Sequence, residues 1–327
     1  MSSFSEITGY GAIISSLQNS IAADRVSHAY IFDGQAGMGK TMLAKAFAKT
    51  LQCEGHGINP CGGCISCRAF ESGNHPDIFT VTPTKKSIGV DDIRGQVVKP
   101  METPPYRYRY KVFIIGNADT MTPAAQNALL KTIEEPSSFG LFLMLSENYN
   151  AFLPTIISRC VLLRLKPLPD ADVIGYLTRN SIGEEQARFY GAFSQGNIGK
   201  AMRLASSQSF MEMRETAVSL AQALRRLDTP DLFARYRVLE PYKDSIQEFL
   251  DLFILWYRDV IIMKETDCPR LLFQPDKQNE IYAEAHATEL PSLYRKFDAI
   301  WQAKRSLQQN GNFQLTLEMM LLSLGSG

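Results

Sequence analysis

Eight consecutive residues constrain this chain more than any other feature. Positions 34–41 satisfy the pattern G-x-x-x-x-G-K-[ST], directly after an apolar strand-like run and directly before a helical pattern. The glycines of the pattern, Gly34, Gly37 and Gly39, let the backbone wrap around a phosphate chain. Lys40 then reaches the β and γ phosphates, and Thr41 can ligate Mg²⁺. The pattern predicts a site for ATP or ADP with Mg²⁺; the alternative is a glycine-rich turn retained only for its shape.

The first half of the chain alternates between strand-like and helical patterns. Short apolar runs rich in β-branched and aromatic residues predict strands at residues 29–32, 77–82, 111–115 and 141–145. Residues 42–51 continue the phosphate loop as a helix. A second helix is expected from Pro123 to about Glu134, with Thr122 as its N-cap and Pro136 as its stop. This alternation argues for a parallel sheet with crossover helices.

The chain changes character at Pro167 and Pro169, which stand too close together for a helix or a central strand. After them the strand signals vanish, and apolar residues repeat at intervals of three and four, as they do over residues 246–261. We therefore expect an α/β part followed by all-α parts. Their predicted ranges are residues 1–166, a small helical module at 167–207 and a larger helical domain at 208–327.

Composition limits what the chain can do. Its 327 residues are 45% hydrophobic with a formal net charge of zero, so a globular protein is expected and no whole-molecule field attracts a phosphate backbone. A free-standing DNA-binding protein is therefore disfavoured. The longest apolar run, residues 249–263, is interrupted by charges, and no signal-like stretch opens the chain. These features predict a cytoplasmic protein with no membrane span, whose six cysteines are reduced or metal-bound.

Four of the cysteines lie close together in the sequence. Cys53, Cys61, Cys64 and Cys67 follow the spacing C-x₇-C-x₂-C-x₂-C within a stretch rich in Gly, Asn and Pro. Four thiolates at such short separations match a closed tetrahedral zinc site, which leaves no open position for water and therefore predicts a structural role. The alternative is a set of unrelated reduced thiols. His56 is a further candidate ligand, but with four sulfurs at hand we interpret it as a loop histidine.

Binding a nucleotide is not the same as hydrolysing it. A hydrolase with this loop also needs an acid at the end of a neighbouring strand, to hold Mg²⁺, and a residue that positions the attacking water. The strand at residues 111–115 is the one that should deliver them, and it is followed by Gly116 and Asn117. Asp119 comes three residues further on, and we interpret it as a solvated loop or capping residue. The loop is therefore predicted to hold nucleotide without consuming it.

Several motifs together resemble one family. They are residues 27–30 before the phosphate loop, the inserted four-cysteine module, N-A-L-L-K-T-I-E-E-P at 127–136 and S-R-C at 158–160. In this order they resemble the bacterial clamp-loader AAA+ subunits of DNA polymerase III, which open the sliding clamp and load it onto primed DNA. The resemblance covers most of the chain, although the match of the tail to the family's C-terminal helix is loose. It implies an AAA+ P-loop domain with an inserted zinc module at 53–67, a small helical lid domain and a C-terminal helical collar domain.

Two departures from the motor subunits of this family, gamma and tau, point to a non-motor subunit. Motor subunits end the acid strand in an Asp-Glu pair, where this chain has Gly116 and Asn117. The family's sensor arginine corresponds to Gly199, so one nucleotide-sensing charge is missing unless Lys200 substitutes for it. The resemblance therefore implies a partner of the gamma or tau and delta subunits in a hetero-oligomeric ring. Its own ATPase activity is not expected, although it would belong to a DNA-directed DNA polymerase (nucleotidyltransferase) holoenzyme.

The resemblance also implies a role for Arg159, which lies in the S-R-C motif. It identifies Arg159 as an arginine finger that enters the ATP site of the adjacent motor subunit, where a guanidinium meets the charge that develops on the transferring phosphoryl group. Without the motif, the simpler interpretation is a surface arginine paired with a carboxylate. Cys160 is interpreted as a small buried hydrophobe rather than a reactive thiol.

Two other functions remain as alternatives. One is an active gamma-like or tau-like ATPase, and the other is a zinc-dependent nucleic-acid-binding protein unrelated to clamp loading. Arg107, Arg109 and Lys111 alternate with tyrosines and form the densest basic and aromatic patch of the chain. Such a patch suits contact with DNA, but alternation at every second residue also describes an edge strand with one solvated face, which we favour.

Overall fold

The computed structural model describes residues 3–224 and 235–325. By its internal contacts the chain divides into two compact units. The first comprises Met1–Leu168 with Asn197–Gly199, and the second comprises Pro169–Gly196 with Lys200–Gly327. The predicted helical parts at 167–207 and 208–327 thus fall largely within one unit. The boundaries of the three-part division stay a prediction.

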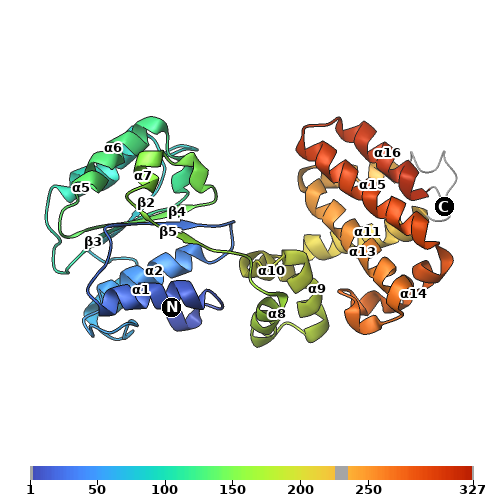
Figure 1. The fold of residues 1–327 in the computed structure, drawn as a ribbon, viewed down its shortest axis with the longest axis horizontal. Coiled ribbons are helices and arrows are strands. Elements are labelled where there is room, and N and C mark those ends of the chain that lie inside the picture. The colour runs from blue at the N-terminus through green and yellow to red at the C-terminus, as the bar shows by residue number, and fades with distance from the viewer. Residues whose placement is uncertain (1–2, 225–234, 326–327) are drawn as a thin grey trace. The chain divides into compact units, whose positions relative to one another are not determined.

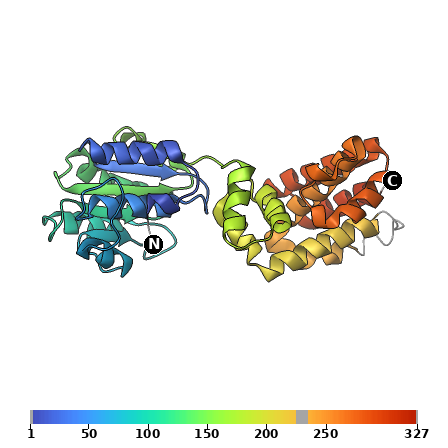
Figure 2. The same cartoon turned by 90° about the horizontal axis from the view of Figure 1, so that it is seen from below.

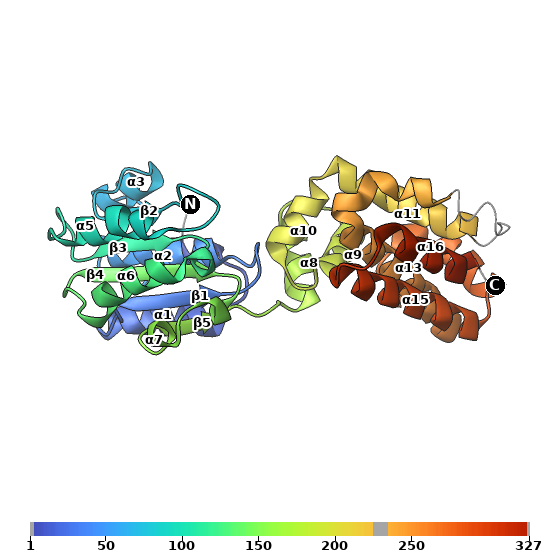
Figure 3. The same cartoon turned by 90° about the horizontal axis from the view of Figure 1, so that it is seen from above.

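The first unit is built on a five-stranded parallel sheet. Its strands are β1 (Ala29–Asp33), β2 (Ile78–Val81), β3 (Lys111–Ile115), β4 (Gly140–Ser146) and β5 (Val161–Arg164), in the order β2-β3-β4-β1-β5, which can be followed in Figure 3. The four predicted strands and the parallel sheet are confirmed. The fifth strand was not predicted, because β5 is four residues long and lies at the edge of the sheet with a partly exposed burial pattern.

Side chains of the central strands point alternately to the two faces of the sheet, and each face carries its own core. One face packs residues such as Phe32 and Leu143 against α1 (Gly11–Ala22) and α2 (Lys40–Leu51). The other packs Ile31 and Phe113 against α6 (Pro123–Glu134) and its neighbours. Figure 1 shows α1 and α2 on one side of the strands with α5, α6 and α7 on the other, and Figure 2 shows the side that α1 and α2 cover. Because both faces are covered, the central strands β1, β3 and β4 are buried along almost their whole length.

Helix α6 begins and ends as the sequence predicts. Thr122 Oγ1 accepts the N–H of Ala125 at 3.2 Å, Pro123 occupies the first helical position, and Glu134 is the last residue. The remaining helices of the first unit are short: α3 (Ile65–Glu71), α4 (Val90–Ile93), α5 (Lys99–Met101) and α7 (Pro154–Ile157).

The second unit is helical, as predicted. Its helices are α8 (Asp170–Arg179), α9 (Glu184–Ser194), α10 (Ile198–Ala205), α11 (Gln208–Leu224), α13 (Ile246–Thr266), α14 (Gln278–Ala287), α15 (Leu290–Gln308) and α16 (Phe313–Gly325). Helix α13 packs against α11, α14 and α15, and it buries Trp256 and Tyr257 almost completely. Within the described parts of the chain, we find no helix with the length and apolar character needed to cross a bilayer.

Candidate functional site

The phosphate loop joins the carboxyl end of β1 to the first turn of α2, which begins at Lys40. Gly37 and Gly39 have φ angles of 84° and 86°, in the left-handed region where a side chain would be strained. This is the strand-loop-helix context that the sequence motif requires, and it directs the N-terminus of α2 toward the loop. Binding of nucleotide by Gly34, Gly37, Gly39, Lys40 and Thr41 stays a prediction.

Lys40 is turned into the loop that precedes it. Its ammonium group donates to the backbone carbonyls of Gly34 and Gln35, the latter at 2.9 Å. Partial burial lowers the pKa of Lys40, while the carboxylates of Glu147, Asp119 and Asp33 oppose that shift. In two of those carboxylates, Asp33 and Asp119, a buried Oδ1 atom has no hydrogen-bond partner among the described residues. The loop is therefore surrounded by acids that retain accepting capacity for a metal ion or for water.

The end of β3 departs from the sequence interpretation at one residue. Gly116 and Asn117 follow the strand as predicted, and a Cβ atom at Gly116 would meet nothing within 4 Å. An acid would thus fit at position 116, and its absence is not imposed by packing. Asp119, in contrast, is not a solvated loop residue. It lies in the short 3₁₀ helix Ala118–Thr120, half-buried, and close enough to Lys40 to act on its pKa.

A segment far along the chain closes against the phosphate loop. The buried Asn197 side chain donates from Nδ2 to the carbonyl of Ala36 at 2.7 Å, and the N–H of Gly199 donates to the carbonyl of Gly37 at 3.1 Å. A Cβ atom at Gly199 would stand 2.6 Å from Gly37 Cα. No arginine could occupy position 199 with this backbone, which gives a physical reason for its absence. Lys200, considered as a substitute, places its ammonium 4.8 Å from the centre of the Phe193 ring within the second unit.

Arg159 follows α7 and is held by three neighbours. Its Nη2 pairs with Glu134 Oε1 at 3.0 Å, and its Nη1 donates to the carbonyl of Thr155 at 3.0 Å and to Ser158 Oγ at 3.2 Å. The side chain is 39% exposed. Cys160, beside it, packs against the core on the α6 face, and burial raises the pKa of its thiol to about 12. The pairing of Arg159 with a carboxylate is the simpler of the two sequence interpretations, and it leaves the finger assignment a prediction.

The four cysteines come together as predicted. The sulfur atoms of Cys53, Cys61, Cys64 and Cys67 all lie within 4.8 Å of one another, so the group could hold a metal ion. Tetrahedral zinc with Zn–S bonds of about 2.3 Å needs sulfurs about 3.8 Å apart, so the cluster has the right size. Backbone N–H groups also point at the sulfurs. Cys53 Sγ accepts from Gly55 at 3.4 Å and Cys61 at 3.2 Å, and Cys64 Sγ accepts from Cys67 at 3.3 Å.

The loop around the cysteines favours thiolates at some positions and opposes them at others. Backbone N–H groups of Gly63 and Cys64, aided by neighbouring thiols, lower the pKa of Cys61 to about 6. Burial raises the pKa of Cys67 to about 12. A bound cation would favour the thiolate form at all four positions despite these differences. The cluster therefore suggests a zinc module.

Sequence analysis missed Asp77, which organises the basic and aromatic patch. Asp77 is fully buried and accepts the backbone N–H groups of Tyr106, Arg107 and Tyr108 at 2.6, 3.0 and 3.0 Å. The predicted edge strand is therefore wrong for residues 106–110: the backbone curls around a carboxylate, and β3 begins only at Lys111. A signal was present in the sequence, because a lone acid directly before an apolar strand needs a partner when it is buried.

The three cations of the basic and aromatic patch each have a partner within the chain. Arg107 pairs with Glu54 at 3.2 Å and Arg109 with Asp24 at 2.5 Å. The buried Lys111 donates to the carbonyls of Pro100 and Thr103 at 2.7 and 2.9 Å. Two of the three cations are thus paired with acids and the third is buried, which weakens the DNA-contact interpretation.

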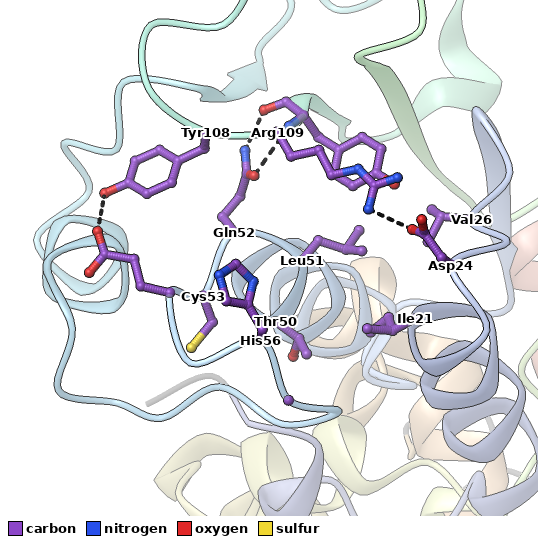
Figure 4. Close-up of a pocket in the computed structure, with 13 residues that line it drawn as sticks. Ile21, Asp24, Val26, Thr50, Leu51, Gln52, Cys53, His56, Tyr108 and Arg109 are labelled. Atoms are coloured by element: carbon purple, nitrogen blue, oxygen red, sulfur yellow. Dashed lines mark hydrogen bonds and ion pairs between the residues drawn. The ribbon is translucent and has the colours of Figure 1, made fainter.

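A pocket of about 290 Å³ lies beside the same patch. Figure 4 shows Arg109 with Asp24 at one side of it, Tyr108 at the other, and Gln52 between them, bound to the backbone of Tyr110. The residues that line this pocket lie before β1, at and after the C-terminal end of α2, and before β3, whereas the phosphate loop joins the end of β1 to the start of α2. Because all strands are parallel, the pocket lies at the opposite edge of the sheet from the loop and is not the nucleotide site.

The parallel sheet, the loop with its left-handed glycines and the helical second unit define a P-loop protein of the AAA+ class. The DNA polymerase III delta subunit family matches residues 9–169, and the C-terminal delta subunit family matches residues 208–325. The chain is 33% identical to DNA polymerase III subunit delta prime of Bacillus subtilis, over 95% of this chain and 94% of that protein. It is 25% identical to the tau subunit of the same organism, over 98% of this chain and 61% of that protein. A gamma subunit-related structure from Thermotoga maritima overlaps 95% of this chain and 98% of that one, with 17% identity and a TM-score of 0.40.

The chain belongs to the delta prime family of DNA polymerase III clamp-loader subunits. It is also similar to tau and tau/gamma subunits of other bacteria, over 53% to 56% of this chain.

Proposed function

We propose that this clamp-loader subunit lends Arg159 to the ATP site of a neighbouring gamma or tau subunit and does not hydrolyse ATP itself. One pair of observations carries the proposal. Strand β3 ends without an acid at Gly116 and Asn117, whereas Arg159 is held half-exposed by Glu134, Thr155 and Ser158. A guanidinium fixed in this way can meet an anion without first losing the entropy of a free side chain.

The phosphate loop is proposed to hold ATP or ADP with Mg²⁺. Thr41 would contribute a hydroxyl to the ion, and the unpartnered oxygens of Asp33 and Asp119 supply acceptors nearby. Lys40 would exchange the carbonyls of Gly34 and Gln35 for phosphate oxygens. A bound Mg²⁺ supplies charge neutralisation, and the protein's part is limited to orienting the phosphates.

The four cysteines are proposed to bind a structural zinc ion. The four sulfurs would supply all four ligands of a tetrahedral ion, so no position would remain for a reacting water. The role of the ion is to fix residues 53–67, a stretch that contains four glycines and has little apolar surface of its own.

The partners proposed are gamma or tau and delta subunits in a hetero-oligomeric ring, which acts on the sliding clamp and primed DNA in the cytoplasm. An active motor is not favoured, because the acids of the motor strand are missing. A zinc-dependent nucleic-acid-binding protein is not favoured either, because the cations of the basic patch are paired within the chain.

The proposal is tested by rebuilding the loader from this chain and its motor and delta subunits. ATP hydrolysis stimulated by primed DNA is measured with wild-type chain and with Arg159→Ala. We expect ATP turnover at the site that receives Arg159 to fall by about 10³-fold or more. The total ATPase rate of the loader should then fall by the amount that this site contributes. Arg188→Ala is the control, since Arg188 is an exposed arginine paired with Glu184. An unchanged rate with Arg159→Ala would remove the finger, and ATP turnover by the isolated chain would remove the non-motor assignment.

A further inference from the structure

Arg159 makes more contacts than a simple surface ion pair, because two hydrogen bonds accompany its pairing with a carboxylate. Its Nη1 atom donates to two oxygens, those of Thr155 and Ser158, and its Nη2 atom pairs with Glu134. Ser158 Oγ is itself fixed, because it donates to the carbonyl of Thr155 at 3.0 Å. Within residues 3–224 and 235–325, the Nε–H of Arg159 has no partner. The guanidinium is thus anchored through its two terminal nitrogens while the edge that carries Nε stays available.

Glu134 stands where a carboxylate is locally unfavourable. It is the last residue of α6, and the C-terminal end of a helix favours cations over anions. Glu135, the next residue, is also exposed, yet no ion pair to it is found in the described chain. Of these two acids, only Glu134 forms an ion pair with Arg159, and both side chains of the pair are 39% exposed. A half-exposed pair adds little stability, so fold stability does not account for this arrangement.

We propose that Glu134 is the positioning residue for Arg159, holding the guanidinium so that its Nε edge can receive a phosphate oxygen of a polyphosphate bound to the neighbouring subunit. The inference rests on the proposed function, because it gives Arg159 a task in another subunit. Glu134 does not touch the reacting atoms. It acts by removing alternative orientations of a long side chain, and a displacement of about 1 Å in a catalytic group can cost about 10²-fold in rate.

The test uses the complete loader and measures Arg159-dependent turnover, defined as the DNA-stimulated rate with wild-type chain minus the rate with Arg159→Ala. We expect Glu134→Ala to remove about nine tenths of this turnover through kcat, with KM for ATP unchanged. Glu134→Gln keeps an oxygen that can accept from Nη2 and should restore part of the loss. Glu135→Ala is the matched control and should keep full turnover. Addition of Glu134→Ala to Arg159→Ala should have no further effect, because the two residues act as one unit.

The outcomes separate this inference from the proposed function. If Arg159→Ala lowers the rate and Glu134→Ala behaves like Glu135→Ala, the finger stands and the positioning role is overturned. If Glu134→Ala raises the rate, the carboxylate restrains Arg159 and the positioning role is also overturned. If Arg159→Ala has no effect, the finger is refuted and the inference is refuted with it. Thermal unfolding of each variant before assembly identifies any that fails to fold, and for such a variant Glu134→Gln takes the place of Glu134→Ala.

Discussion

Replacement of Asp77 by alanine should damage the first unit more than any exposed acid can. Asp77 is 0% exposed, and its two oxygens accept three backbone N–H groups from residues 106–108. Hydrogen bonds to a charged acceptor contribute about 1.5–3 kcal/mol each. Tyr106 is 85% exposed, so water can reach part of the segment and the lower end of that range applies. Three bonds at the lower end amount to about 4.5 kcal/mol.

The consequence should reach the cysteine module, because the same segment contacts it. Tyr108 donates to Glu54 at 3.4 Å and Arg107 pairs with Glu54, which follows Cys53 directly. The ring of Tyr108 also packs against His75, whose Nε2 lies 3.1 Å from Ser66 Oγ in α3. When the backbone of residues 106–108 loses its acceptor, these contacts loosen. Zinc should then pass to a chelator faster from Asp77→Ala than from the wild-type chain.

The assay is thermal unfolding followed by two signals. Both tryptophans, Trp256 and Trp301, lie in the second unit, so fluorescence identifies the transition of that unit, whereas circular dichroism reports on the whole chain. For a unit of this size each kcal/mol shifts the midpoint by about 2–4 °C, so the first unit should melt about 9–18 °C lower. Asp77→Asn keeps one accepting oxygen and should lose about half as much. Asp91, an exposed acid of the same unit, provides the control Asp91→Ala. A shift with Asp77→Ala no larger than that of the control would refute the reasoning.

Two predictions concern the cysteines. Cys64→Ser should abolish stoichiometric zinc, measured by elemental analysis of purified protein, whereas Cys268→Ser should retain it; zinc retained by Cys64→Ser would contradict a four-sulfur site. Cys160 should react with iodoacetamide at pH 8 about 10³-fold more slowly than a thiol of ordinary pKa, because burial raises its pKa from 9.0 to about 12 and depletes the thiolate. Mass spectrometry of timed samples measures this, and rapid labelling of Cys160 in folded protein would show that the thiol is not buried.

The parts of the fold that the sequence predicts are those that depend on neighbours along the chain. Four strands follow from short apolar runs, α6 follows from Thr122 and Pro123, and the cysteine cluster follows from its spacing. Strand β5 was not predicted, because a run of four partly exposed residues has too little hydrophobic periodicity to indicate a strand. In each of the successes, one local interaction or one side-chain pattern is enough to fix the element.

The features that sequence analysis missed depend on contacts between distant segments. Asp77 binds residues about thirty positions away, and the same contacts convert an alternating strand-like pattern into a curled loop. Asn197 lies 161 residues from Ala36, to which it donates. Asp119 seemed to be a loop residue because its position next to Lys40 depends on how β3 and β1 pair through β4. Tertiary hydrogen bonds of this kind override local propensity and leave no periodic trace.

The contacts of the loop give a physical reason why the proposed phosphate site can be kept in a chain whose β3 strand ends without an acid. Four consecutive carbonyls, at residues 34–37, accept donors from the chain: Lys40 reaches the first two, Asn197 the third and the Gly199 N–H the fourth. The loop therefore holds its conformation by internal contacts. A phosphate chain would use the N–H groups instead, so only Lys40 must change partners when a nucleotide binds. The loop can thus be retained without an acid at position 116. Contacts within the subunit hold the loop in place, whereas the acid matters only for hydrolysis, which the proposed function assigns to a neighbouring subunit.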